Sequence, residues 1–283
     1  MSFRTTSTST RSRARLLLAA TAIGATALSV PSPASAAPAA PGPLSSPDSH
    51  RMGSTIAAHE RLSTTAAVTT STGSTTGTQG MDVSRWQGDV DWTAARAAGA
   101  RFAYVKATEG TSYTSPYFKQ QYNGSYGVGM IRGAYHFALP DRSSGTAQAD
   151  WFVGHGGGWS ADGKTLPPLL DIEYNPYGST CYGLTPTKMV SWIRSFSDRV
   201  KARTGRAPAV YTTTSWWNQC TGSNSSFGTT NPLFIARYAS TVGTLPAGWT
   251  RYTFWQYADS GIFPGDQDTF NGGMTKLRTF ARG

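Results

Sequence analysis

The stretch Leu169-Leu170-Asp171-Ile172-Glu173 places two carboxylates at the end of an apolar β-strand. Residues i and i+2 of a strand point to the same face, about 7 Å apart along the chain, so Asp171 and Glu173 face the same way. One of two carboxyls this close keeps its proton, which gives a proton donor beside an anion. That pairing suits cleavage of a glycosidic bond. Exposed strand-end acids, or caps of the following loop, fit the pattern equally well.

Strands and helices alternate around this stretch. Strands are expected at 80–83, 102–105, 130–137, 169–173, 209–212, 233–236 and 253–257. Helices are expected at 91–98, 115–127, 143–155 and 185–205, the last starting with the capping pair Thr185-Pro186. Such alternation, five βα units followed mostly by strand, predicts a parallel sheet. A small, irregular β/α barrel fits this length, and a doubly wound open sheet is the alternative.

The first 36 residues have the pattern of a secretory signal peptide. Basic residues precede the short apolar stretch 16–30, and Ala34-Ser35-Ala36 fits a cleavage site. The apolar stretch is shorter than a comfortable membrane span, so an uncleaved anchor is the less favoured alternative. We therefore expect a secreted, extracellular protein without stable membrane association.

Residues 37–78 differ in composition from the rest of the chain. Sixteen of these 42 residues are Ser or Thr, and Ala and Pro fill much of the remainder. Such a segment buries too little apolar surface to offset the entropy of ordering it. We expect a linker, a pro-segment or a disordered spacer. A brief helix over 56–62 is compatible with the sequence, but nothing else supports one.

Residues 79–283 form the expected working domain. They hold 33 aromatic residues and 19 basic against 13 acidic residues, a net charge of +6, whereas the whole chain of 283 residues carries +10. A positive domain is attracted at low salt to partners that carry phosphate and carboxylate groups, although the charge also serves solubility. The domain lacks a basic run or a nucleic-acid motif, so no nucleic-acid partner is expected.

Several chemistries lack the residues that they require. No Gly-x-Gly-x-x-Gly follows the first strand and no phosphate-loop lysine is present, so a nucleotide cofactor has no support. Two cysteines and four histidines, two of the latter ahead of the domain, do not suit a metal site. No Gly-x-Ser-x-Gly motif supports a serine hydrolase. We expect neither a cofactor nor a metal.

Further acidic residues follow other strands. Asp82 closes the first strand and is a candidate third carboxylate, or else forms an Asx-turn or a salt bridge to Arg85. Lys106 and Glu109 follow the second strand and either reach a polar substrate or form a structural ion pair. Asp268 lies with Asp266 near the last strand, in a Gly-Asp turn that is weak evidence by itself.

Aromatic residues at strand ends are candidates for stacking on sugar rings, with core packing as the simpler interpretation of most. His136 is expected to be a core histidine. The aromatic candidates are Tyr104, Tyr135, Tyr211, Tyr238, Trp255 and Tyr257. Cys181 and Cys220, the only cysteines, predict one disulfide in an exported protein.

These motifs, in this order, resemble glycoside hydrolase family 25, the Chalaropsis-type lysozymes, over essentially all of 79–283. Each motif alone is weak, but together and in register they are specific. The basic leader resembles that of secreted actinomycete members. The matching pieces are Gly80–Ser84, Trp86–Gly88, Lys106–Gly110, Gly133–Phe137, Asp171–Glu173, Phe254–Tyr257 and Asp268–Gly272.

The resemblance implies a single irregular, TIM-like β/α barrel with five βα units and three further strands. It implies a monomeric lysozyme that acts on bacterial peptidoglycan, at the β-1,4 bond between N-acetylmuramic acid and N-acetylglucosamine. The loops 154–165 and 175–183 depart from the family pattern. The implied roles are Glu173 as general acid/base, Asp171 as its partner, Asp82 as a third acid, Asp268 as the acid after the last strand, and Tyr135 and Glu109 in the groove.

Two retaining mechanisms and two rival functions remain open from the sequence. Either Asp82 or Asp171 attacks the sugar directly, or the substrate's N-acetyl oxygen attacks while Asp171 orients the amide. The second is favoured because Asp171 and Glu173 project from one strand on the same side. The rivals are a non-catalytic glycan-binding protein on the same barrel, which needs no carboxylate pair, and a chitinase-like endo-hexosaminidase.

Overall fold

The computed structural model describes residues 50–60 and 77–283. The predicted signal peptide lies outside the described residues, as does most of the predicted spacer. The boundaries at residues 36 and 78 therefore stay predictions.

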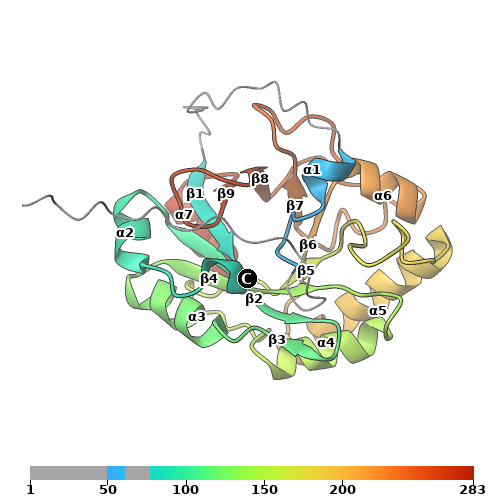
Figure 1. Ribbon diagram of the computed structural model, residues 1–283, viewed down its shortest axis with the longest axis horizontal. Helices are drawn as coiled ribbons and strands as arrows, with labels where there is room; N and C mark the ends of the chain where they lie inside the picture. Colours follow the sequence, from blue (N-terminus) through green and yellow to red (C-terminus); the bar gives the residue numbers. More distant parts are fainter. Residues whose placement is uncertain (1–49, 61–76) are drawn as a thin grey trace, which may run out of the picture. The chain divides into compact units, whose positions relative to one another are not determined.

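Eight strands close into a barrel, drawn in Figure 1. Neighbouring strands run parallel except β9, which is antiparallel to both β8 and β1 and so completes the ring. The short β3 (Tyr113–Thr114) adds to the end of β2 outside it. The open-sheet alternative is therefore wrong. The barrel strands are β1 (Thr78–Val83), β2 (Phe102–Glu109), β4 (Ile131–Phe137), β5 (Leu169–Asp171), β6 (Ala209–Thr212), β7 (Leu233–Ala236), β8 (Phe254–Ala258) and β9 (Asp266–Phe270).

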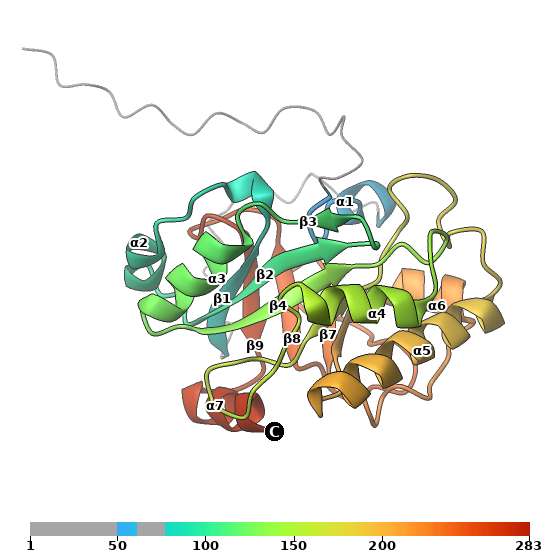
Figure 2. The same cartoon turned by 90° about the horizontal axis from the view of Figure 1, so that it is seen from below.

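A helix follows each of the first five barrel strands, and three strands then close the ring without helices between them, as predicted. Figure 2 shows α3, α4 and α5 along the outer face of the sheet. The bounds of α6 and α7 were not predicted. The helices are α1 (Ile56–His59), η1 (Arg85–Gln87), α2 (Trp92–Ala97), α3 (Phe118–Gly127), α4 (Gly145–Gly154), α5 (Pro186–Thr204), α6 (Thr214–Thr221) and α7 (Met274–Arg282).

Local signals account for the ends of the predicted helices. The Asp91 side chain accepts a hydrogen bond from the Ala94 amide at 2.9 Å and so caps α2. Thr185 caps α5, which ends at Gly205 in the left-handed conformation (φ 79°) that glycine adopts without strain. One face of α5 is fully buried, and it carries Met189, Ile193, Phe196 and Val200.

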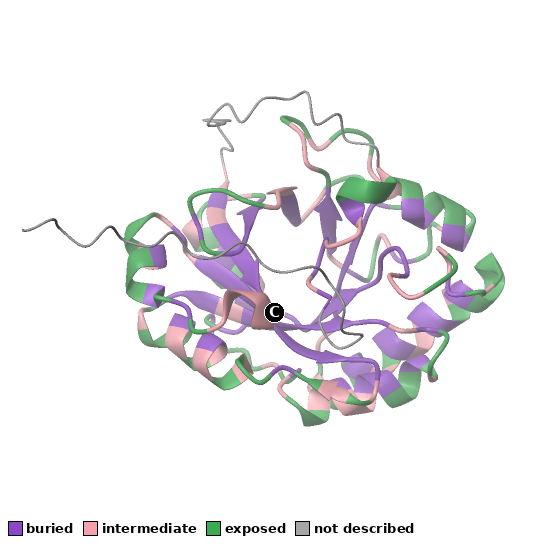
Figure 3. Ribbon diagram, in the orientation of Figure 1, coloured by how far each residue is buried: buried purple, intermediate pink, exposed green. Residues whose placement is uncertain are grey.

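The core has two layers, one on each side of the sheet. Strands are buried on both faces while the helices expose their outer sides, as Figure 3 shows. The inner layer is largely aromatic and includes Phe102, Tyr104, Phe234 and Phe254. Leu277 of α7 belongs to the same cluster and covers the end of the barrel where the parallel strands begin. Polar inward side chains are therefore left to the opposite end.

Cys181 and Cys220 form a disulfide, with Cα atoms 5.3 Å apart. The bond ties the loop after β5 to α6 and confirms the predicted pairing. None of the helices within 50–60 and 77–283 combines the length and apolar character needed to cross a bilayer.

Candidate active site

Four carboxylates meet where the parallel strands end. Asp82 is the next-to-last residue of β1. Asp171 is the last residue of β5, and Glu173 follows it two positions later. Asp266 begins the antiparallel β9 and lies directly opposite Asp82. All four are at most 2% exposed. The carboxyl ends of the strands are where β/α-barrel enzymes form their active sites.

The alternation of β5 brings Asp171 and Glu173 to one side. Leu170 and Ile172 belong to the outer core layer, under the helices, whereas Leu169 belongs to the inner layer. Asp171 and Glu173 share the phase of Leu169 and therefore project into the barrel mouth.

The surroundings of Glu173 raise the pKa of its carboxyl. Burial raises its pKa from 4.5 to about 7, although hydrogen bonds from Thr55 and Gly53 act in the opposite direction. The Gly53 amide donates to Oε1 at 2.7 Å and the Thr55 hydroxyl donates to Oε2 at 2.7 Å. Both donors come from the segment that precedes the barrel.

Gln256 of β8 organises the side of the site that faces Asp82. Its Nε2 donates to Asp82 Oδ2 at 2.7 Å and to Asp266 Oδ2 at 3.2 Å. Its Oε1 accepts from the hydroxyls of Tyr211 at 2.6 Å and Tyr238 at 3.0 Å. Burial raises the pKa of Asp82 to about 7, and the hydrogen bond from Gln256 limits the rise.

The carboxyl oxygens of Asp171 and Asp268 are buried and have no hydrogen-bond partner within 50–60 and 77–283. Burial raises the pKa of both well above the usual range, reinforced at Asp171 by Glu173 and at Asp268 by Asp82. Asp268 lies opposite Gly80, one inward position deeper than Asp266. A buried carboxyl without a partner is costly. The unpartnered oxygens of Asp171 are therefore available to a ligand.

Lys106 supplies the positive charge beside these acids. Its ammonium lies 2.5 Å from Glu109 Oε2, and both side chains are at most 2% exposed. Glu109 also accepts a hydrogen bond from the Tyr177 hydroxyl. Lys106 and Glu109 therefore form an ion pair at the barrel mouth, which is one of the two alternatives for these residues; the other is contact with a polar substrate.

Three of the predicted aromatic site residues lie at the mouth. Tyr211 and Tyr238 bond Gln256, and the Tyr135 hydroxyl accepts from the Met52 amide at 3.2 Å. Tyr135 therefore faces the same segment that covers Glu173.

Tyr104 and Trp255 pack in the core, and the prediction that they contact substrate stays a prediction. Tyr104 lies deep in the barrel, where its hydroxyl donates to the Pro167 carbonyl ahead of β5. Trp255 points to the outer layer because it alternates with the inward Gln256, and its indole donates to the Arg237 carbonyl. Both residues are core.

The sequence did not predict a role in the site for two of its residues, Gln256 and Asp266. Gln256 lies in the motif Phe254–Tyr257. A side-chain amide with no acidic residue near it in the sequence does not by itself indicate a role in catalysis. Asp266 was named beside Asp268 near the last strand but was given no role, although the two residues share one strand phase. The alternation rule that selected Asp171 with Glu173 applies equally to this pair.

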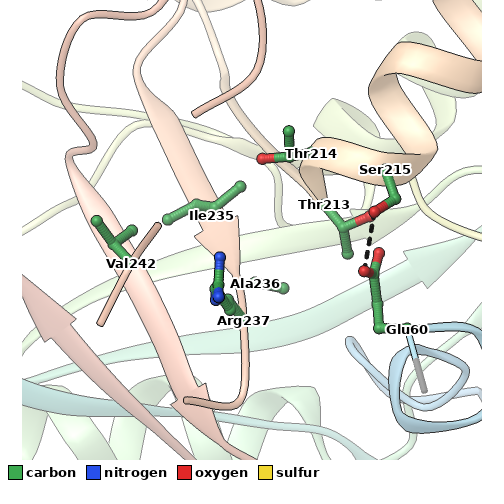
Figure 4. Close-up of a pocket in the computed structure, with 8 residues that line it drawn as sticks. All are labelled: Glu60, Thr213, Thr214, Ser215, Ile235, Ala236, Arg237 and Val242. Atoms are coloured by element: carbon green, nitrogen blue, oxygen red, sulfur yellow. Dashed lines mark hydrogen bonds between the residues drawn. The ribbon is translucent and has the colours of Figure 1, made fainter. Parts of the chain in front are cut away.

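Two cavities lie at the barrel mouth. One of about 210 Å³ is lined by Glu60, Thr213, Ser215 and Arg237, and Figure 4 shows Glu60 hydrogen-bonded to Ser215 at one side of it. The other, of about 270 Å³, is lined by Glu109, Tyr113, Leu139, Arg142 and Tyr177. No cluster of His, Cys, Asp or Glu in the described ranges has the arrangement of a metal site.

A closed β/α barrel with a buried carboxylate pair at its mouth fits a glycoside hydrolase in fold and site. Comparison with known families agrees. Residues 81–266 match the Glycosyl hydrolases family 25, and the chain belongs to this family. It is a glycoside hydrolase of the lysozyme, or N-acetylmuramidase, class.

Relatives support the assignment over most of the domain. Lysozyme M1 of Streptomyces globisporus is 50% identical over 212 residues, which cover 73% of this chain and 72% of the relative. An N,O-diacetylmuramidase of Chalaropsis sp is 50% identical over 209 residues, covering 72% of this chain and 99% of the relative. The solved bacterial lysozyme from Streptomyces coelicolor superposes with a TM-score of 0.71 at 49% identity, covering 74% of this chain and 98% of that one.

Proposed function

We propose that the chain hydrolyses the β-1,4 bond between N-acetylmuramic acid and N-acetylglucosamine in bacterial peptidoglycan, with retention at the anomeric carbon. Glu173 donates its proton to the leaving oxygen and later accepts one from the attacking water. The observation that carries this role is its burial, which raises its pKa to about 7, so that a large share of the acid carries a proton near neutral pH.

Asp171 orients the N-acetyl group whose oxygen attacks the anomeric carbon. It projects beside Glu173 from the same strand, and its unpartnered oxygens are suited to accept the substrate amide N–H. A protein nucleophile has to lie across the scissile bond from the acid, with the carboxyls about 5–5.5 Å apart. Two carboxylates on one side of one strand fit the substrate-assisted route better.

Asp82 stabilises the positive charge that develops on the sugar, and Gln256 holds it in place. Tyr135, Tyr211, Tyr238, Glu109 and Asp268 line or support the groove. The retained carboxylate pair argues against a non-catalytic glycan-binding protein, because binding alone needs no buried proton donor.

The test is clearing of purified bacterial walls by wild type, Glu173→Gln and Asp198→Asn. Asp198 lies exposed on α5 and makes the matched control for removal of a carboxylate. Loss of a general acid is expected to slow clearing about 10²–10⁴-fold, with Asp198→Asn unchanged. Equal clearing by wild type and Glu173→Gln would refute the role of Glu173. Failure to clear walls by every chain, including one in which residues 50–60 are displaced from the barrel, favours the binding-protein alternative.

Substrate range and location form a second part of the proposal. Relatives named N,O-diacetylmuramidase support activity on O-acetylated walls as well, which clearing of matched acetylated and deacetylated walls tests. Turnover of chitin without turnover of walls would instead favour the chitinase-like alternative. The disulfide supports action outside the cell, since such bonds persist in oxidising compartments.

A further inference from the structure

The segment 50–60 lies across the proposed active site rather than away from it. At one end, Lys106 donates to the His50 carbonyl, and the ring of Tyr177 meets the His50 ring edge-on at 4.7 Å. Lys106 pairs with Glu109, and Glu109 and Tyr177 line the cavity of about 270 Å³. The segment therefore starts beside this cavity.

The middle of the segment contacts the proposed proton donor itself. The Gly53 amide and the Thr55 hydroxyl donate to the two oxygens of Glu173. The Gly53 carbonyl accepts from the Tyr238 hydroxyl at 3.1 Å. With both Glu173 oxygens engaged, a glycosidic oxygen cannot reach the carboxyl while the segment is in place.

Gly53 fits where no larger residue can. Its φ of +80° is a conformation that glycine adopts readily. A Cβ at this position would lie 2.3 Å from the Tyr238 hydroxyl, 2.6 Å from Gln256 Oε1 and 2.8 Å from the Tyr211 hydroxyl. The backbone thus approaches the Gln256 network as closely as its atoms allow.

Apolar side chains anchor the segment on either side of Gly53. Met52 and Ile56 are fully buried and belong to the inner core layer of the barrel, whereas Ala57 and Ala58 are exposed. Within 50–60 the structure departs from the expectation of little buried apolar surface, and the rest of the predicted spacer stays a prediction. A four-residue helix such as α1 is not stable alone, so docking on the barrel shapes it.

Charge and hydrogen bonding complete the fit. Arg51 lies 4.0 Å from Asp266 at the acidic cluster. At the far end, Glu60 accepts from the hydroxyls of Tyr174 at 2.7 Å and Ser215 at 2.9 Å, the latter drawn in Figure 4. Figure 1 shows the segment in blue beside β7 and α6. It therefore ends at the cavity of about 210 Å³.

We propose that residues 50–60 are an internal inhibitor that occupies the glycan-binding groove, from the Glu109 cavity over Glu173 to the Ser215 cavity. This rests on the proposed function, because the groove is the one assigned to peptidoglycan. The short connection 61–77 keeps the segment at high effective concentration. Cleavage within 61–77 removes that advantage and lets the glycan displace the segment.

The first test compares wall clearing by otherwise complete chains. Gly53→Ala adds a single methyl group at the crowded position, and Met52→Asp/Ile56→Asp removes the apolar anchors. Both are expected to clear walls at least tenfold faster than wild type. Ala57→Asp, on the exposed face of the same segment, is the matched control and is expected to match wild type. Equal rates for all four chains would overturn the inhibitor.

Hydrogen exchange at the Gly53 amide gives a readout that does not depend on activity. The amide is expected to be protected in wild type and in Ala57→Asp, and to exchange rapidly in Met52→Asp/Ile56→Asp. Rapid exchange in wild type would overturn docking even if walls are cleared. If the amide is protected but no chain clears walls, the proposed function fails, and the inhibitor role with it, while the docking stands.

Discussion

Gln256 Nε2 donates to Asp82 Oδ2 at 2.7 Å, which links β8 to β1 across the mouth of the barrel. The two residues are 174 positions apart, and β9 lies between their strands. The same amide accepts from two tyrosine hydroxyls on its other side. A single neutral side chain thus fixes an acid and two phenols that face the proposed substrate groove.

Replacing Gln256 with Leu is expected to lower stability and slow catalysis together. The change removes the donor that limits the pKa of Asp82 and leaves the buried hydroxyl of Tyr211 without its acceptor. Each unsatisfied buried group costs about 1–3 kcal/mol, so the free energy of unfolding is expected to fall by several kcal/mol. Denaturant titration measures it, with the exposed Gln219→Leu as control. A loss of less than about 1 kcal/mol would contradict the network.

The stability of the chain is expected to fall as pH rises from about 4 to about 7. Asp82 and Glu173 have a pKa of about 7 when folded, above their ordinary values of 3.8 and 4.5. The folded state therefore binds more protons in this range, and the free energy of unfolding decreases with pH. The contribution is complete below pH 4 and is lost through pH 7.

Glu173→Gln tests this pH dependence. One such group accounts for on the order of 3 kcal/mol, so removing its titration is expected to flatten the stability profile between pH 4 and 7. Denaturant titrations across this range measure the slope, with Asp198→Asn as control. An unchanged slope would show that Glu173 titrates normally in the folded chain.

Tyr104→Phe tests whether the Tyr104 hydroxyl contributes to core stability or to catalysis. The hydroxyl of Tyr104 donates to the Pro167 carbonyl at 3.1 Å, and its ring belongs to the inner core layer. The variant is expected to lose about 1 kcal/mol of stability and to keep its rate of wall clearing within twofold. A tenfold loss of rate at full stability would return Tyr104 to the active site.

Replacing both cysteines with serine is expected to lower the free energy of unfolding by about 4 kcal/mol, because the disulfide closes a loop between residues 39 apart. Thermal unfolding with and without reductant provides the measurement. If the variant is as stable as wild type, and reductant does not change the thermal unfolding of wild type, the disulfide does not stabilise the fold.

Local signals in the sequence were enough to predict much of this architecture. The alternation at Leu169–Glu173 predicted a shared face for Asp171 and Glu173, and the Thr185 cap and Gly205 predicted the ends of α5. These signals act over a few residues, so the sequence displays them directly. The cysteine pair was predictable because only one pairing exists.

Features that depend on contacts between distant strands were not predictable. Whether Tyr104 reaches the mouth depends on its depth in the closed barrel, and the pairing of Gln256 with Asp82 depends on the order of β8, β9 and β1. Residues 50–60 gave a weak signal because their order comes from a groove built elsewhere in the chain. Composition alone therefore described this segment as a spacer.

The most direct test of the central claim compares Glu173→Gln on two kinds of glycan. Cleavage of a natural wall glycan requires protonation of the leaving oxygen. In an aryl glycoside with an acidic phenol, the phenolate departs without being protonated. Relative to wild type, the first bond cleavage by Glu173→Gln is expected to be slower by 10² or more on wall glycan and by less than tenfold on the aryl glycoside. Equal losses on the two substrates would contradict Glu173 as the proton donor.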